Sequence, residues 1–166
     1  MSLSRMQLSR FQKEKIAAAI DLVGEVFQEF VAPDYSEEGN VTFKKFIEYG
    51  SIIKKLDSGE MKIWGSFTNH KLSGVIATLK TNHICMLFVR KEYQRQGIAR
   101  GLLENVIDTC RLDKNINSIT VNSSPYAVEA YRHLGFKDVS TEQTLNGIRF
   151  TPMEYRISGE KTACRE

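Results

Sequence analysis

The segment QRQGIA, residues 94–99, has the residue types and spacing of a phosphate-binding loop. It joins the apolar stretch at 84–89 to a stretch with helical spacing that begins near Gly97. At a helix start four backbone N–H groups lack intrahelical acceptors, and the macrodipole places partial positive charge there. Gly97 lets a ligand approach the main chain without a Cβ in the way. The segment therefore predicts binding of a phosphate, and a pyrophosphate would suit it; a helix start whose N–H groups are solvated is the alternative.

Arg95 and Arg100 add mobile positive charge beside this predicted helix start. Two better known phosphate loops are absent, because the sequence has neither G-x-x-x-x-G-K-[ST] nor G-x-G-x-x-G after a strand. Nucleotide hydrolysis and nicotinamide binding therefore lose their main support.

The hydrophobic pattern predicts the elements that must position this loop. The first third should hold a long amphipathic helix over residues 16–31 and a second helix, capped by Ser36 or Asn40 and stopped by Asp57-Ser58-Gly59. We then expect a hairpin over 61–79 that turns at TNHK, a central strand at 84–89, a helix from about 98 to 110 and a strand at 118–122. Last come a helix that Ser124-Pro125 begins and Gly135 closes, and a hairpin over 141–157 around Asn146-Gly147. This order favours an α/β fold with helices on both faces of a mixed sheet. We expect residues 1–166 to form a single domain.

Composition and charge exclude several classes of protein. A net charge of +3 falls short of the concentrated basic patch of a nucleic-acid binder, so we expect no nucleic acid as partner. Cys85, Cys110 and Cys164 are scattered and the three histidines are spread out, which predicts no disulfide framework and no metal site. Without a leader or a long apolar stretch, we expect a cytoplasmic protein with no membrane segment.

Three stretches, in sequence order, resemble the GNAT superfamily of acetyl-CoA-dependent N-acetyltransferases. They are LFV before the loop, QRQGIA in it, and VNSSPYAVEAYRHLGF after the following strand, and together they cover roughly residues 60–140. The resemblance implies a GNAT-like, mainly antiparallel sheet and acetyl-CoA as the acetyl donor. It also implies that the loop holds the coenzyme A pyrophosphate through Gln94, Arg95, Gln96, Gly97, Ile98, Ala99 and Arg100.

The same resemblance implies the rest of the coenzyme site. A bulge in the strand ending in LFV would splay it from the strand SITVN, so that the main chain of Leu87, Phe88 and Val89 holds the pantetheine arm and polarises the thioester carbonyl. Asn122 would line the opposite edge. Tyr131 falls on the family's general-acid tyrosine and would protonate the departing thiolate. A packing role for Tyr131 is the alternative, with Tyr126 as a nearby competitor.

The general base is not assigned by the sequence. Many family members place a Glu on the central strand, where this chain offers His83, Cys85 and Met86. Glu29, Tyr35 and His83 are the candidates for the acceptor side, while Cys85 fits a small buried apolar residue. By analogy FVAPDYSEEG borders the acceptor site, and its acids Asp34, Glu37 and Glu38 either attract a cationic amine or favour a helix start.

We therefore predict direct acetyl transfer from acetyl-CoA to a primary amine through a ternary complex. A small-molecule amine is favoured over the amine of a protein or peptide. A non-catalytic acyl-CoA sensor is the alternative from another class, motivated by the missing strand carboxylate. The hairpin over 141–157 either pairs across a two-fold axis or finishes the sheet, and we favour the homodimer.

Overall fold

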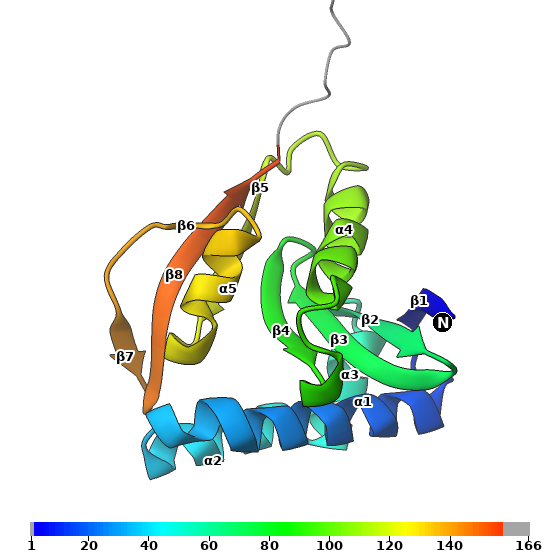
Figure 1. The fold of residues 1–166 in the computed structure, drawn as a ribbon, viewed down its shortest axis with the longest axis horizontal. Helices are drawn as coiled ribbons and strands as arrows, with labels where there is room; N and C mark the ends of the chain where they lie inside the picture. Colours follow the sequence, from blue (N-terminus) through cyan, green and yellow to red (C-terminus); the bar gives the residue numbers. More distant parts are fainter. Residues whose placement is uncertain (1, 158–166) are drawn as a thin grey trace, which may run out of the picture.

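The computed structural model describes residues 2–157, which form an eight-stranded sheet with helices on both faces (Figure 1). The elements are β1 (Leu3–Leu8), α1 (Lys13–Val26), the π-helical η1 (Phe27–Val31), the 3-10 turn η2 (Ala32–Asp34), α2 (Glu37–Phe46), α3 (Tyr49–Asp57), β2 (Met61–Thr68), β3 (Lys71–Leu79), β4 (His83–Val89), η3 (Lys91–Tyr93), α4 (Ile98–Cys110), β5 (Ser118–Ser123), η4 (Pro125–Ala127), α5 (Val128–His133), β6 (Lys137–Asp138), β7 (Gln143–Leu145) and β8 (Ile148–Arg156). The strand order is β1-β2-β3-β4-β5-β8-β6, with β7 paired to β8. Within residues 2–157, β4 and β5 are the one parallel pair, so the mixed, mainly antiparallel sheet is confirmed.

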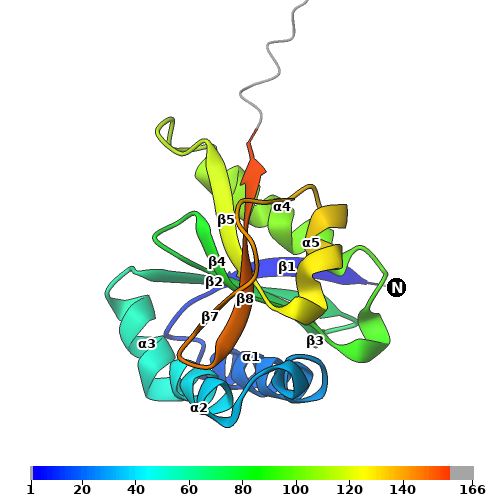
Figure 2. The ribbon, with the colours of Figure 1, turned by 90° about the vertical axis from the view of Figure 1, so that its left-hand side faces the viewer.

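Different helices cover the two faces of the sheet (Figure 2), and each face has its own apolar cluster. Helices α1 and α3 bury Ile16, Leu22 and Ile52 against one face. On the other face α4 and α5 bury Leu102 and Tyr131. Burial of this kind contributes roughly 1.5–3 kcal/mol for each large apolar side chain, so both faces hold the central strands in place.

The turns follow the local sequence. Asn69 and His70 have positive φ values of 51° and 68°, and Asn146 and Gly147 have 52° and 79°. Two consecutive residues with positive φ give the type I′ geometry that suits tight hairpins, so both predicted hairpins are confirmed. Gly135, at φ 105°, closes the α5 region in the left-handed conformation, also as predicted.

Both predicted N-terminal helices need correction. The first ends as an α-helix at Val26 and continues as a π-turn and a 3-10 turn, because Pro33 cannot continue the hydrogen-bond ladder. The second is two helices, since Glu48 has an extended ψ of 140° between α2 and α3. Ser36 does cap α2, where its side chain accepts from the Gly39 N–H at 3.2 Å.

Strand β1 was not predicted from the sequence. Its sequence LSRMQL has no regular alternation of apolar and polar residues, and only the last residue, Leu8, is buried. Backbone pairing with β2 defines this edge strand, with a further contact from the ion pair of Arg5 with Glu104 at 3.9 Å. Ser124 was predicted to cap the helix that follows β5. It instead precedes the 3-10 turn η4, and its side chain makes no capping hydrogen bond.

The C-terminal hairpin finishes the sheet within one chain. Strand β8 pairs with β5 on one edge and with β6 and β7 on the other. The tip of the β7–β8 hairpin contacts α2, where a Cβ on Gly39 would lie 2.2 Å from the Gly147 carbonyl oxygen. The homodimer stays a prediction.

Candidate active site

The connection from β4 to α4 is a loop built for anion binding. Gly97 precedes the helix with φ 81°, and Arg95 has φ 62°, which is uncommon for a residue with a Cβ. Left-handed residues of this kind turn successive N–H groups toward one side. No backbone N–H from residue 95 to residue 100 has an acceptor within the described part of the chain. These free donors, at the positive end of α4, are what a phosphate requires.

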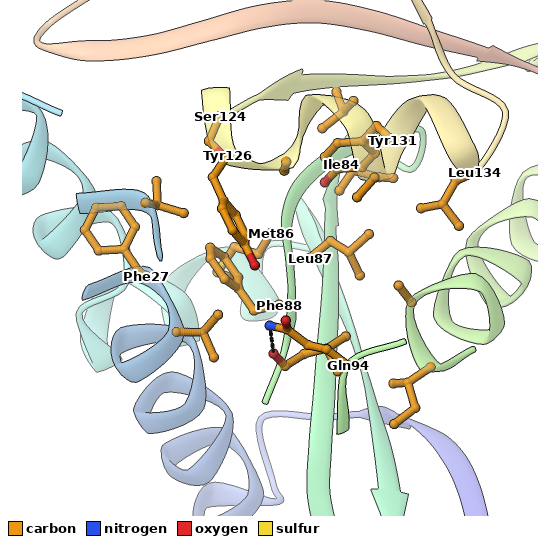
Figure 3. Close-up of a pocket in the computed structure, with 18 of the residues that line it drawn as sticks. Phe27, Ile84, Met86, Leu87, Phe88, Gln94, Ser124, Tyr126, Tyr131 and Leu134 are labelled. Carbon is orange, nitrogen blue, oxygen red and sulfur yellow. Dashed lines mark hydrogen bonds between the residues drawn. The ribbon is translucent and has the colours of Figure 1, made fainter. Parts of the chain in front are cut away.

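Side chains fix the shape of this loop. The Gln94 Nε2 donates to the Val89 carbonyl at 3.1 Å, which ties the loop to the end of β4 (Figure 3). The Gln96 Nε2 donates to the Glu92 carbonyl at 3.3 Å. Arg100 donates to the His133 carbonyl at the end of α5, at 3.1 Å. Gln96 is not among the residues that line the cavity described below, so its place is in supporting the loop.

Strands β4 and β5 separate after a short parallel contact. They pair at His83 with Thr120 and at Ile84 with Val121, and at no later residue. The register of β4 against β3 shifts between Ala77 and Thr78, so Cys85 is an extra residue opposite β3. The expected bulge is therefore present in β4, and beyond it the two strands leave a gap in the sheet.

A cavity of about 580 Å³ occupies this gap. Its loop half lies on the α4–α5 side of the sheet and is lined by Gln94, Arg95, Gly97, Ile98, Ala99 and Arg100. Its aromatic half lies on the α1–α2 side and is lined by Phe27, Tyr35, Phe43, Phe88 and Tyr126. The cavity thus passes through the sheet and joins two different surfaces.

The main chain of β4 offers hydrogen-bonding groups to the cavity. The Arg90 N–H donates to the Ser73 carbonyl, so the backbone groups of Arg90 point toward β3. Because backbone groups alternate in direction along a strand, those of Phe88 also point toward β3. Leu87 and Val89 then turn theirs toward the gap, which agrees with the Val89 carbonyl accepting from Gln94. Leu87, Phe88 and Val89 all line the cavity, and Asn122 lines it from β5.

Tyr131 stands between the two halves. Its side chain is 6% exposed, packs edge-on against Phe136 at a ring distance of 5.2 Å and lines the cavity. Its hydroxyl makes no hydrogen bond to any residue from 2 to 157. Burial raises the pKa of Tyr131, and Cys85 and Tyr35 nearby add to this, so the phenol stays protonated at neutral pH.

The three acceptor-side candidates lie in different places. Tyr35 lines the aromatic half, and burial, with the Asp34 charge, raises its pKa to about 12. Glu29 lies outside the cavity and forms an ion pair with Lys91 at 3.0 Å. His83 also lies outside, at the start of β4, where its Nδ1 is 2.8 Å from the Thr120 Oγ1. Of the three, the structure brings only Tyr35 to Tyr131.

Cys85 lines the cavity but is not arranged as a nucleophile. Its Sγ lies 3.5 Å from the Ala77 carbonyl, and burial raises the pKa of its thiol to about 12. The thiol therefore stays protonated, in agreement with the apolar role predicted for it.

The aromatic half was predicted only in part, through Tyr35 and the main chain of Phe88. Phe27 and Phe43 share the helical spacing of the apolar positions around them, which predicts core residues, and Phe88 was predicted to contribute only its main chain. Tyr126 was named only as a competitor of Tyr131. The clustering of aromatic residues at 27, 30, 35 and 43, around a proline, is the signal that would have pointed to a binding surface.

Metal-binding clusters and membrane-spanning helices are both absent from residues 2–157. No group of His, Cys, Asp and Glu side chains gathers there in a way that would hold a metal ion. None of the helices in that range has both the length and the apolar character needed to cross a membrane.

The chain matches a family model and several solved structures. Residues 31–157 match the acetyltransferase (GNAT) domain. The fold is similar to that of the PaiA N-acetyltransferase from Thermoplasma acidophilum in complex with coenzyme A, with a TM-score of 0.76 and 20% identity over 94% of this chain and 99% of that one. It is similar to an acetyltransferase of the GNAT family from Staphylococcus aureus, with a TM-score of 0.70 and 17% identity over 95% and 100% of the two chains. The sequence has no match among curated proteins.

A protein-modifying enzyme is also among the similar structures. The ribosomal-protein-S18-alanine N-acetyltransferase from Escherichia coli has a TM-score of 0.58 and 18% identity over 99% of this chain and 100% of that one. At these identities the likeness shows a shared fold.

Proposed function

Because the chain belongs to the GNAT acetyltransferase family, we propose that it moves the acetyl group of acetyl-CoA directly to a primary amine. One observation carries this proposal: a cavity through the sheet joins the free N–H groups of residues 95–100 to the hydroxyl of Tyr131, which is unpaired within residues 2–157. Acetyl-CoA would supply an activated thioester. We also propose a cytoplasmic location, which the free thiols of Cys85 and Cys110 support.

The loop fits the coenzyme in charge and in space. An ideal Cβ built on Gly97 has no heavy atom within 4 Å, so the main chain faces open space there. Arg95 and Arg100 form no ion pair with any residue from 2 to 157 and stay available to an anion. The N–H groups of residues 95–100 would hold the pyrophosphate, and Arg95 and Arg100 would add charge around it.

The chemistry would take place at the gap between β4 and β5. The amine nitrogen forms a bond to the acetyl carbon while the bond from that carbon to sulfur breaks. The Leu87 and Val89 backbone groups face this gap, and a fixed N–H there stabilises the negative charge that develops on the acetyl oxygen. Tyr131 would give its proton to the departing thiolate, since its raised pKa keeps the proton available at neutral pH. The proton that the amine nitrogen loses as the amide forms would pass to water, and Tyr131 would regain a proton from water.

A small-molecule acceptor is supported by the way that α2 meets the C-terminal hairpin. The Thr42 hydroxyl donates to the Asn146 carbonyl at 3.3 Å, and Arg149 donates to the Asp34 carbonyl at 3.3 Å. Together with the close approach of Gly39 and Gly147, these contacts fill the space that an extended peptide would need between α2 and the hairpin. The similar Escherichia coli enzyme acts on a protein alanine, so a protein acceptor is the competing outcome of an acceptor screen.

A non-catalytic acyl-CoA sensor is the second candidate, favoured by one observation. No Asp or Glu lines the cavity within residues 2–157, so no carboxylate there would take a proton from an ammonium group. An amine must reach the site in its neutral form for the enzyme to work, because an ammonium nitrogen has no lone pair for attack.

Release of free coenzyme A thiol from acetyl-CoA, measured with a panel of primary amines and with peptides, tests the proposal. We expect release that depends on the amine and is accompanied by acetylated amine in the mass spectrum. Saturable acetyl-CoA binding without release for any acceptor would favour the sensor. Release with peptides alone would replace the small-molecule acceptor by a protein.

A further inference from the structure

The aromatic half of the cavity is a continuous set of stacked rings. Phe27 and Phe43 stack with ring centroids 4.0 Å apart, and Tyr35 meets Phe27 edge-on at 5.6 Å. Phe43 also lies 6.0 Å from Phe88 on β4. These rings come from η1, the segment after η2, α2 and β4, so four separate parts of the chain line one space. Figure 3 shows two of them, Phe27 and Phe88.

A further pair of rings joins the two sides of the gap. Tyr126, on η4, stacks on Phe30, on η1, with ring centroids 4.9 Å apart. Tyr126 lines the cavity and is 47% exposed, so it lies where the aromatic half opens to solvent. A ligand that enters on this side meets an aromatic edge before it reaches Tyr131.

Negative charge near the aromatic half is already paired or lies outside it. Glu25 pairs with Arg90 at 2.8 Å, and Glu29 pairs with Lys91 at 3.0 Å. The Asp34 charge reaches Tyr35 and raises its pKa, yet Asp34 does not line the cavity. The cavity-lining arginines, Arg95 and Arg100, belong to the loop half. A second positive charge on an acceptor would therefore lose its hydration here and gain no carboxylate in return.

From these contacts we propose that the acceptor is a primary amine carried on an aromatic ring, which the aromatic half binds by stacking. The inference rests on the proposed function and names its substrate class. Phe27 is 2% exposed and supports the other rings from behind, whereas Tyr35, Phe43 and Phe88 are only partly buried. These three, with the exposed Tyr126, offer faces and edges for another ring. The apolar surroundings also favour the neutral form of the amine, so binding itself would help to prepare the nucleophile.

Binding without turnover tests this directly. The full chain, saturated with coenzyme A, is titrated by calorimetry with 2-phenylethylamine, hexylamine and 1,4-diaminobutane. We expect 2-phenylethylamine to bind about tenfold more tightly than either of the other two. Equal or tighter binding of hexylamine or of 1,4-diaminobutane, or no binding of 2-phenylethylamine, would overturn the aromatic assignment.

Two variants locate the preference. Tyr126→Glu places a carboxylate at the opening and should weaken 2-phenylethylamine about tenfold while strengthening 1,4-diaminobutane. Tyr49→Glu is the matched control, because Tyr49 is 41% exposed and lies outside the cavity. Phe43→Leu keeps an apolar wall without a ring and should make 2-phenylethylamine and hexylamine bind equally. Unchanged selectivity in both cavity variants would overturn the proposal.

These outcomes are separable from those of the proposed function. Release of coenzyme A thiol with aliphatic amines, combined with no preference for the aromatic amine, would leave the acetyltransferase proposal standing and remove this inference. Selective binding of 2-phenylethylamine without thiol release would support the aromatic site and remove the proposed activity.

Discussion

The two halves of the cavity are built from different parts of the chain. The loop half presents backbone N–H groups from consecutive residues, 95–100, at the start of one helix. The aromatic half presents side chains from η1, α2, β4 and η4, which are far apart in the sequence. Backbone N–H groups suit a ligand group that is the same in every reaction, such as a pyrophosphate. Aromatic side chains, in contrast, can each be changed by a single substitution. Under the proposed function, specificity for the acceptor would therefore be set in the aromatic half.

Tyr131→Phe should have the largest effect, because Tyr131 serves both halves. Loss of a general acid lowers kcat by about 100-fold or more, while coenzyme A affinity should change by less than about twofold. Steady-state thiol release and calorimetry measure the two quantities. Because the raised pKa keeps the phenol protonated, kcat of the unmodified protein should also show no loss of the acid as the pH rises to about 10. Unchanged turnover in the variant would remove Tyr131 from the mechanism.

Gly39→Ala should break the contact that holds α2 to the hairpin beside the aromatic half. The new Cβ would lie 2.2 Å from the Gly147 carbonyl oxygen, so the backbone must shift, at a cost of roughly 1–3 kcal/mol in the free energy of unfolding. Gly50→Ala is the control, since its Cβ has no atom within 4 Å. Thermal and urea unfolding measure both. Equal stability of the two variants would show that the contact is not tight.

Arg100→Gln should lower the affinity of the loop half for coenzyme A without an effect on the aromatic half. Loss of one exposed charge beside the helix start should reduce coenzyme A affinity about fivefold and leave amine affinity unchanged. The effect should shrink at high salt, because screening reduces the contribution of exposed charges. Arg111→Gln, at the other end of α4, is the matched control. An equal loss of amine affinity would mean that the halves are not independent.

His83→Gln should have the smallest effect, and only on stability. Burial, with the Lys80 charge, lowers the pKa of His83 below 6.5, so the unfolded chain binds this proton more readily. The unfolding free energy should therefore be highest above pH 6.5 and fall as the pH drops below it. The variant should reduce this dependence and keep full turnover at pH 8. Lost turnover at pH 8 would return His83 to the list of candidate bases.

The sequence predicted the loop half because the information is local. Gly97, its flanking residues and the apolar strand before them are consecutive, and a helix start leaves its N–H groups free whatever the rest of the chain does. The hairpins were also predictable, since Asn146-Gly147 specifies its own turn. No local sequence pattern predicted β1, because an exposed edge strand needs no apolar face.

The sequence did not predict that Phe27 and Phe43 line a cavity, because helical spacing indicates only that one face of a helix is apolar. Phe27 and Phe43 fall on such faces whether the space opposite them holds side chains or a cavity. Similarly, no sequence pattern predicts the ion pair between Glu29 and Lys91, because the two residues are far apart in the chain. Contacts between remote elements decide both cases, and they are fixed by the packing of η1 against β4 and α2.

Binding of acetyl-CoA by the loop half can be measured by a calorimetric titration. Acetyl-CoA is added to the unmodified protein, to Gly97→Trp and to Gly59→Trp. Gly59 has φ 78° and open space around its Cβ, much like Gly97 at 81°, but lies at the end of α3 away from the loop. We predict saturable binding to the unmodified protein and to Gly59→Trp, and none to Gly97→Trp. No binding to the unmodified protein, or equal binding to all three, would contradict the account.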